Sequence, residues 1–187
     1  MRRRPAAAVI GLMVWILAGC GVAGGGTTPV AQTGSGASET DVRFSQQMIP
    51  HHQQSIQLAK LASQRSTGEF VKTTATEITT AETEEIELMS GWLQSWNVDV
   101  PAAGTAGHSM HGMLSAAEIS LLENASGADF DRQWLVTMAK HLRSGVEMAK
   151  TALATGQHAP TKTLAQEIVT GQGARIAAID GRIAQAK

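Results

Sequence analysis

The chain has one cysteine and no tyrosine, and only 4 % of its 187 residues are aromatic. A single cysteine excludes an internal disulfide bond. With so few aromatic side chains, the core must rest on Leu, Ile, Val, Met and Ala. No strand-like alternation of apolar and polar residues is visible. The apolar run at residues 6–17 is shorter than the roughly 20 residues that a membrane-spanning helix needs.

The N-terminus has the features of an export signal. Three arginines precede the apolar run, which ends at Leu-Ala-Gly followed by Cys20. This ending resembles a bacterial lipobox, which predicts that residues 1–19 are removed and that Cys20 carries the lipid; the alternative is a plain secretory signal with a chance cysteine. We therefore expect a chain that is exported and lipid-anchored to the outer face of the bacterial cytoplasmic membrane or cell envelope.

The segment after the signal predicts a tether followed by one domain. Residues 20–39 are rich in Gly, Ser and Thr and cannot bury enough apolar surface to fold. Residues 40–187 have the size of a single domain. Without the three arginines of the signal, 12 Lys and Arg stand against 16 Asp and Glu, a formal net charge of −4. That balance gives no electrostatic reason to expect a nucleic-acid partner.

Two segments of this domain carry the same unusual combination of residues, 90 positions apart. DVRFSQQMIPHHQQSIQLAK aligns with DRQWLVTMAKHLRSGVEMAK, and the register continues without a gap into the following segments. The matched positions include Asp41 and Asp131, Met48 and Met138, His51 and His141. The pattern predicts an all-α four-helix bundle built from two duplicated helical hairpins. The repeats are about 41–97 and 128–187, and the connection is 98–127.

Helical spacing and stop signals predict the individual helices. We expect long helices at about 40–65, 69–96, 128–155 and 160–186, and a short one at 115–124 that opens on a Ser115–Glu118 capping box. Pro50 requires either a helix that begins there or a kinked one, and the apolar stripe upstream favours the kink. His158, beside a proline at a helix junction, is expected to be a capping or surface residue.

The repeated methionines and histidines are the first candidates for chemistry. Met48, His51 and His52 share one helical face, as do Met138, His141 and Met148. Thioether sulfur prefers Cu(I), and imidazole suits copper, zinc and nickel, so a mixed set predicts a soft metal ion such as copper. The alternative is that methionine fills gaps in the core and histidine bonds buried polar groups. That alternative does not explain why the two recur together.

Two further groups could bind metal. The connection contains His108, Met110, His111 and Met113, a compact cluster of soft ligands that could equally be a solvated loop. In the second helix, Glu82 and Glu85 could point inward and supply oxygen ligands.

The sequence lacks the motifs of several enzyme classes. A ferritin-like di-iron oxidase needs Glu-x-x-His motifs, and none occurs. There is no Gly-x-Ser-x-Gly turn for a hydrolase and no phosphate-binding loop. We therefore expect a binding protein rather than an enzyme, with no organic cofactor.

The Met48–His52 motif resembles the first half of the domain-of-unknown-function family 305, as do Met89-x-x-Trp-Leu-x-x-Trp, Gly112–Ser115 and Phe130–Asp131 leading to Met138-x-x-His. The resemblance covers about residues 40–180. It implies a fold similar to ferritin-like bundles and, in some members, export and copper binding.

The chain departs from the family pattern mainly in its second half. Leu142 follows His141 where the family usually has a second histidine. The usual mid-helix Gln is kept as Gln172 but is Glu82 in the first half, and the Glu after it becomes Arg175 in the second half. These changes predict that the second half is the weaker binder.

The sequence thus predicts an extracytoplasmic lipoprotein that binds copper for sequestration or transfer. The alternative is an envelope interaction or structural lipoprotein whose Met and His side chains are inert in the core.

Overall fold

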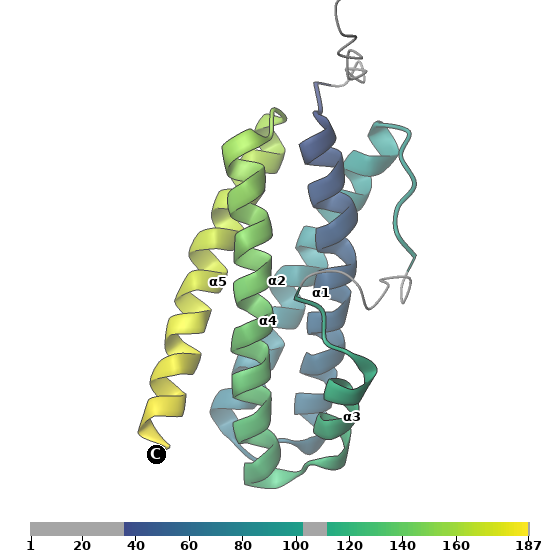
Figure 1. The fold of residues 1–187 in the computed structure, drawn as a ribbon. Helices are drawn as coiled ribbons and strands as arrows, with labels where there is room; N and C mark the ends of the chain where they lie inside the picture. Colours follow the sequence, from purple (N-terminus) through teal and green to yellow (C-terminus); the bar gives the residue numbers. More distant parts are fainter. Residues whose placement is uncertain (1–35, 103–111, 187) are drawn as a thin grey trace, which may run out of the picture.

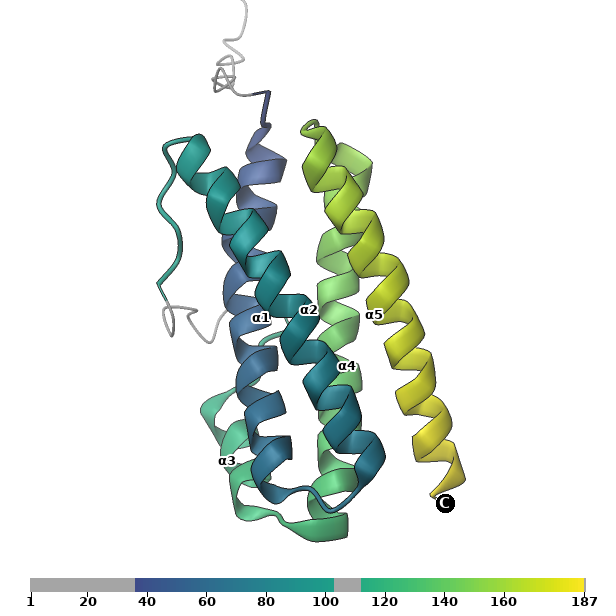
Figure 2. The same cartoon turned by 180° about the vertical axis from the view of Figure 1, so that it is seen from behind.

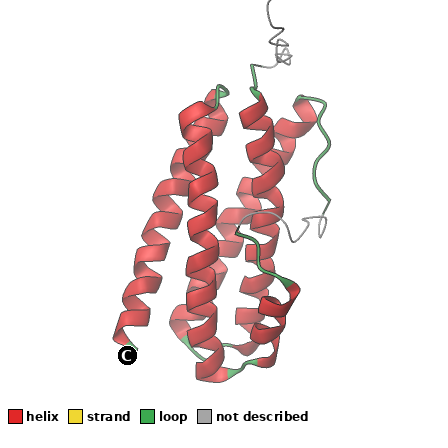
Figure 3. Cartoon of the chain, viewed as in Figure 1, coloured by secondary structure: helices red, strands yellow, loops and turns green. Residues whose placement is uncertain are grey.

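The computed structural model describes residues 36–102 and 112–186, and all regular structure in these ranges is helical (Figures 1 and 3). The five helices are α1 (Glu39–Arg65), α2 (Glu69–Ser95), α3 (Ala116–Asn124), α4 (Gly127–Thr155) and α5 (Ala159–Gln185). Each lies within a few residues of its predicted range, so the predicted all-α bundle is confirmed. The predicted signal, Cys20 and most of the tether lie outside the described residues.

The four long helices form two antiparallel hairpins, α1–α2 and α4–α5, which meet mainly along α1 and α4 (Figures 1 and 2). The start of α1, the end of α2 and the α4–α5 turn lie at one end of the bundle, and the C-terminus lies at the other. The short α3 packs beside α1 and α4. None of the helices in the described ranges is long and apolar enough to span a bilayer.

Side-chain caps open α1, α3 and α5. The predicted capping box of Ser115 and Glu118 opens α3, and an equivalent box of Ser38 and Asp41 opens α1. His158 caps α5, since its Nδ1 accepts a hydrogen bond from the Thr161 amide, 3.3 Å away. The prediction that His158 is a capping or surface residue is therefore confirmed.

Helix α1 continues through Pro50 without a break, so it does not begin at that residue. Proline has no N–H to donate to the preceding turn, and this missing bond normally destabilises a helix. Pro50 is buried, as are the residues on either side of it, Ile49 and His51, so burial favours the helix at this point. The threonines of α2 are also unfavourable in a helix, and their hydroxyl groups form hydrogen bonds with its main chain. Thr76, Thr79 and Thr83 donate to main-chain carbonyls one turn earlier within the helix.

The core has three tiers. One apolar cluster lies toward the start of α1 and includes Phe44 and Met48, and a second lies toward the opposite end and includes Trp134 and Met138. A set of buried polar residues, which we call the polar layer, separates the two clusters along α1, α2 and α5 and adjoins the second cluster on α4: His51, His52, Ser55, Glu82, His141 and Gln172. Buried polar groups are costly unless they bind one another or a ligand, so this layer is the candidate site.

Candidate metal centre

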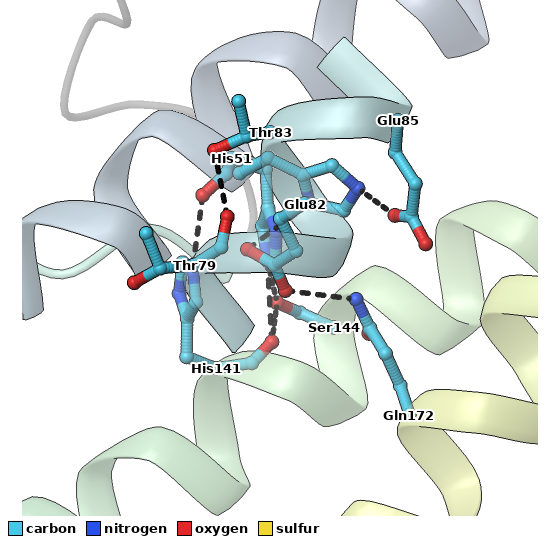
Figure 4. Close-up of polar contacts among 9 residues, drawn as sticks. His51, Thr79, Glu82, Thr83, Glu85, His141, Ser144 and Gln172 are labelled. Atoms are coloured by element: carbon cyan, nitrogen blue, oxygen red, sulfur yellow. Dashed lines mark hydrogen bonds and ion pairs between the residues drawn. The ribbon is translucent and has the colours of Figure 1, made fainter. Parts of the chain in front are cut away.

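Two histidines from the two hairpins stack face to face at the centre of the polar layer. The ring centroids of His51 on α1 and His141 on α4 are 3.8 Å apart, and the planes differ by 5°. Each Nε2 lies 3.2 Å from the main-chain oxygen of the other histidine. The Nε2 of His51 also lies 2.9 Å from the Ser144 hydroxyl (Figure 4). The two positions are 90 residues apart, the same spacing as the sequence motifs.

The second histidine also contacts the connection between the hairpins. Nδ1 of His141 lies 3.1 Å from the Gly112 carbonyl oxygen. A neutral ring has one N–H, so it can donate to only one of its two carbonyl neighbours. Gly112 has φ +88°, and a side chain there would overlap that of Ser144. Glycine is therefore required where the connection rests on His141.

His52 lies between two glutamates of α2. Its Nε2 is 2.6 Å from Glu85, and its Nδ1 is 3.6 Å from Glu82. His52 is fully buried, so both ring nitrogens face carboxylates without access to water. This arrangement stabilises the imidazolium form and leaves neither nitrogen available to a metal ion unless a glutamate moves.

A second cross-hairpin pair joins α2 to α5. The Gln172 amide nitrogen donates to the Glu82 carboxylate, with Nε2 3.2 Å from Oε1. These residues are again 90 positions apart. Because the first half has Glu82 at the position that matches Gln172, the contact joins an amide to a carboxylate rather than two amides.

Burial and neighbouring charges separate the titration of these groups. Burial lowers the pKa of His51 well below its usual range, and the neighbouring His141 and His52 lower it further. Burial likewise lowers the pKa of His141, to about 4. Burial would also lower the pKa of His52, but Glu82 and Glu85 raise it above its usual value. Near neutral pH the stacked pair is therefore uncharged, which is the form of imidazole that binds metals.

Glu82 is a buried carboxyl group whose ionisation is unfavourable. Burial raises its pKa to about 7, against the opposing effects of His52 and of a hydrogen bond from Ser55. The predicted inward orientation of Glu82 and Glu85 is thus observed for Glu82, which is 1 % exposed, whereas Glu85 is partly exposed.

The methionines of the two motifs do not lie within the polar layer. Met48 and Met138 are fully buried, but in the two different apolar clusters. Met148 is partly buried beside the cluster that contains Met48. Met113 is partly exposed next to Gly112, and the remaining predicted loop ligands, His108, Met110 and His111, lie outside the described residues.

Three comparisons relate this arrangement to known proteins. A family model described as a domain of unknown function, DUF305, matches residues 41–181. The chain belongs to the DUF305 family. The resemblance seen in the sequence is therefore confirmed, whereas no curated protein matches the chain.

Solved DUF305 structures share the fold over most of their length. A DUF305 fragment from Deinococcus radiodurans is 28 % identical, over 80 % of this chain and 98 % of that one, with a TM-score of 0.72. A DUF305 protein from Streptomyces coelicolor, provisionally classed as secreted, is 27 % identical over 78 % and 91 %, with a TM-score of 0.71. CopM in its Cu(II)-bound form is 27 % identical over 79 % and 97 %, with a TM-score of 0.70, and CopM has also been solved with Cu(I) and with silver.

In this DUF305 chain the polar layer offers few candidate metal ligands. Within residues 36–102 and 112–186, no three His, Cys, Asp or Glu side chains converge as a metal cage. His51 is the one histidine of the layer that is neutral and has a ring nitrogen, Nδ1, without a hydrogen-bond partner in the described ranges. It is therefore the best-placed candidate for a histidine ligand in the described part of the bundle.

The sequence motif did not point to several residues of this centre. Gln54 binds both the amide and the carbonyl of Leu114, at 2.7 and 3.1 Å, and so holds the connection against α1. Ser144, at the matching position of the second repeat, contacts His51. Both follow their histidine by three residues on the same helical face, and that spacing could have identified them.

Proposed function

We propose that this protein is an exported, lipid-anchored DUF305 protein that binds copper and sequesters it or hands it over without catalytic turnover. Cys20 is the lipid attachment point in this proposal, and the lipid anchors the protein to the membrane. The bundle histidines form one site. The loop residues His108, Met110, His111 and Met113 form a second, looser site.

One observation carries the proposal: a neutral, buried histidine in the polar layer, His51, has a ring nitrogen that no described residue satisfies. A buried unpaired imidazole nitrogen is costly, and a metal ion would remove that cost. The copper-bound and silver-bound forms of CopM, a relative with the same fold, support the choice of metal.

Titration of the untagged mature domain with Cu(I) and Cu(II), by competition with chelators of known affinity, tests this function. Replacing His51 and His52 together by alanine should weaken the tighter binding event by at least about tenfold, or roughly 1.4 kcal/mol. Replacing His108, Met110 and His111 by serine should weaken a separate, weaker event.

The matched control is His158→Asn, which removes an imidazole outside the polar layer and keeps a residue that caps helices well. It should leave both events unchanged. If the parent protein binds copper in neither oxidation state, the proposed function is wrong.

A second candidate is an envelope interaction or structural lipoprotein with no metal. It is favoured by Met48 and Met138, which pack in apolar clusters as gap-filling methionines do. Under this alternative the parent and the variants would bind copper equally weakly.

A further inference from the structure

Three rings from two helices meet at the end of the bundle where α1 begins (Figures 1 and 2). The ring centroids of Trp92 and Trp96, near the end of α2, are 6.4 Å apart. The ring of His158, which caps α5, lies edge-on at 5.4 Å from Trp92 and 5.0 Å from Trp96. Trp96 is buried against the apolar cluster that contains Met48, whereas Trp92 is partly exposed. None of these rings belongs to the polar layer.

The two segments that carry these rings contain no charged residue. Residues 88–98 at the end of α2 and residues 151–161 across the α4–α5 turn lack Asp, Glu, Lys and Arg. Leu88, which is 51 % exposed, lies one helical turn before Trp92 on the same face of α2. At the start of α1 the exposed Glu39 and Arg43 pair with each other, with their side-chain atoms 3.6 Å apart. This end of the bundle is therefore uncharged or balanced in charge.

The opposite end of the bundle is different. Arg65 lies in the last turn of α1, Glu69 in the first turn of α2, Asp129 in the first turn of α4 and Arg182 in the last turn of α5. Charged side chains at helix ends suit contact with water, because their desolvation is costly. The two ends thus differ in the surroundings that they suit.

The end with the tryptophans is also the end that the tether joins. In the proposed function Cys20 carries the lipid, and the 18 residues at 21–38 separate it from Glu39, the first residue of α1. Eighteen residues span at most about 65 Å, so the lipid keeps this end within that distance of the bilayer. The opposite end lies farther along the chain by about 40 Å, the length of the 27-residue α1.

We propose that this end of the bundle docks on the interface of the lipid bilayer through Leu88, Trp92 and Trp96, which we call the aromatic end. The proposal rests on the proposed function, because the lipid on Cys20 brings the aromatic end to the membrane. Tryptophan gathers at membrane interfaces, since its ring has an apolar body and a polar N–H group. A single acyl chain binds a membrane only marginally, so a contact made by the protein strengthens the anchor.

The docked orientation has two consequences. The polar layer is held away from the lipid, because His51 lies 12 residues into α1 and hence about 18 Å from its start. Docking also does not depend on anionic lipid or on salt, because the aromatic end supplies no excess of positive charge.

Tryptophan fluorescence of the metal-free mature chain, bound through its lipid to phosphatidylcholine vesicles, tests the docking. Lipids brominated on the upper part of their acyl chains quench an indole only at short range. Trp92 and Trp96 should be quenched, and Trp134 is the internal control. Trp134 is fully buried in the other apolar cluster, where its indole N–H donates to the Leu58 carbonyl oxygen, 2.9 Å away. Trp134→Phe should therefore keep the quenching, and Trp92→Phe with Trp96→Phe should abolish it.

A charge placed on the aromatic end should weaken the contact. Leu88→Glu should reduce the quenching at least twofold, and its exposed position leaves the core intact. Leu121→Glu, at a leucine of α3 that is 66 % exposed, is the matched control and should change nothing. Added phosphatidylglycerol should not change the quenching of the parent.

Several results would overturn the inference: no quenching of Trp92 and Trp96 in the parent, equal quenching of Trp134, or quenching that requires phosphatidylglycerol. Protection of Trp92 from acrylamide that grows with protein concentration, without vesicles, would also overturn it, because a second copy would then cover the aromatic end. Mass spectrometry reports whether Cys20 carries lipid. If it does not, the anchor of the proposed function fails, and coupling Cys20 to a maleimide lipid still measures the docking. Copper titration of the same sample tests metal binding independently of both.

Discussion

At the scale of single residues, the three buried histidines differ in charge and in partners although two of them are adjacent. His51 is neutral and its Nδ1 has no partner among the described residues, His141 is neutral and lies between two carbonyl groups, and His52 faces two carboxylates. Position on the helix decides this, because neighbouring residues point to different parts of the bundle. In the second half, Leu142 replaces His52 and Arg175 replaces Glu85, so the charged cluster exists once.

A buried carboxylate with a raised pKa makes stability depend on pH. Because the pKa of Glu82 rises to about 7 on folding, the folded chain holds this proton more tightly than the unfolded chain, and stability falls as the pH rises from about 4.5 to 7. His52, whose pKa is also raised, stabilises the fold below its ordinary pKa and loses this effect as the pH rises further. Both effects destabilise the metal-free protein at alkaline pH.

Glu82→Gln should therefore gain stability relative to the parent as the pH rises. The difference should be small near pH 5 and reach the order of 1–3 kcal/mol near pH 8, since glutamine cannot ionise. Denaturant unfolding of the metal-free proteins at the two pH values measures it, with the exposed Glu84→Gln as control. A difference that is constant across pH would show that the cost of ionising Glu82 has been misjudged.

At the scale of helices, the sequence was sufficient to predict where the helices lie but not which residues form the candidate site. Helical spacing, the Ser115–Glu118 box and the prolines located all five helices to within a few residues. The spacing placed His51 and His141 correctly on inward faces, but it could not tell which buried neighbours share a tier with them. The role of the methionines as ligands stays a prediction. Met48 lies one turn from His51, and at that distance along the axis it belongs to the apolar cluster.

The junction of the two hairpins near the tether depends on Asp41. Its carboxylate accepts hydrogen bonds from the amides of Gln157 and His158, at 2.9 and 3.0 Å, as well as from Ser38. Burial alone would raise the pKa of Asp41, but the bonds from Ser38, Gln157 and His158 lower it below its usual value. This contribution to stability is present above the ordinary pKa near 4 and is lost as the pH falls through the lowered value.

Asp41→Asn should cost about 1–3 kcal/mol at pH 7, because the charge-assisted bonds are lost. The cost should shrink as the pH falls below about 4, where the parent carboxylate becomes protonated. Asp131→Asn at the matching position of the second hairpin is the control. Asp131 has a single long contact from Thr67, at 3.5 Å, so its substitution should cost clearly less in the same unfolding experiment. Equal losses would mean that the Asp41 bonds do not hold the junction.

At the scale of the whole molecule, the chain combines a rigid apolar frame with one polar tier. Apolar clusters on both sides fix the helices, so the histidines are held in place without a bound ion. The end of the bundle where α1 begins is the end that the tether from Cys20 would join (Figure 1). In the proposed function this arrangement holds the copper site on the outer face of the bacterial cytoplasmic membrane or cell envelope.

The most direct measurement of that central claim is the copper X-ray absorption spectrum of the variant with serine at positions 108, 110 and 111. The variant keeps only Met113 of the proposed loop site, so copper that survives desalting and is lost when His51 is also replaced would be bound by the bundle. The account predicts that the variant keeps copper and that the spectrum shows the outer-shell scattering of imidazole, which is lost when His51 is also replaced by alanine. A variant that emerges free of copper, or an unchanged spectrum without His51, would contradict it.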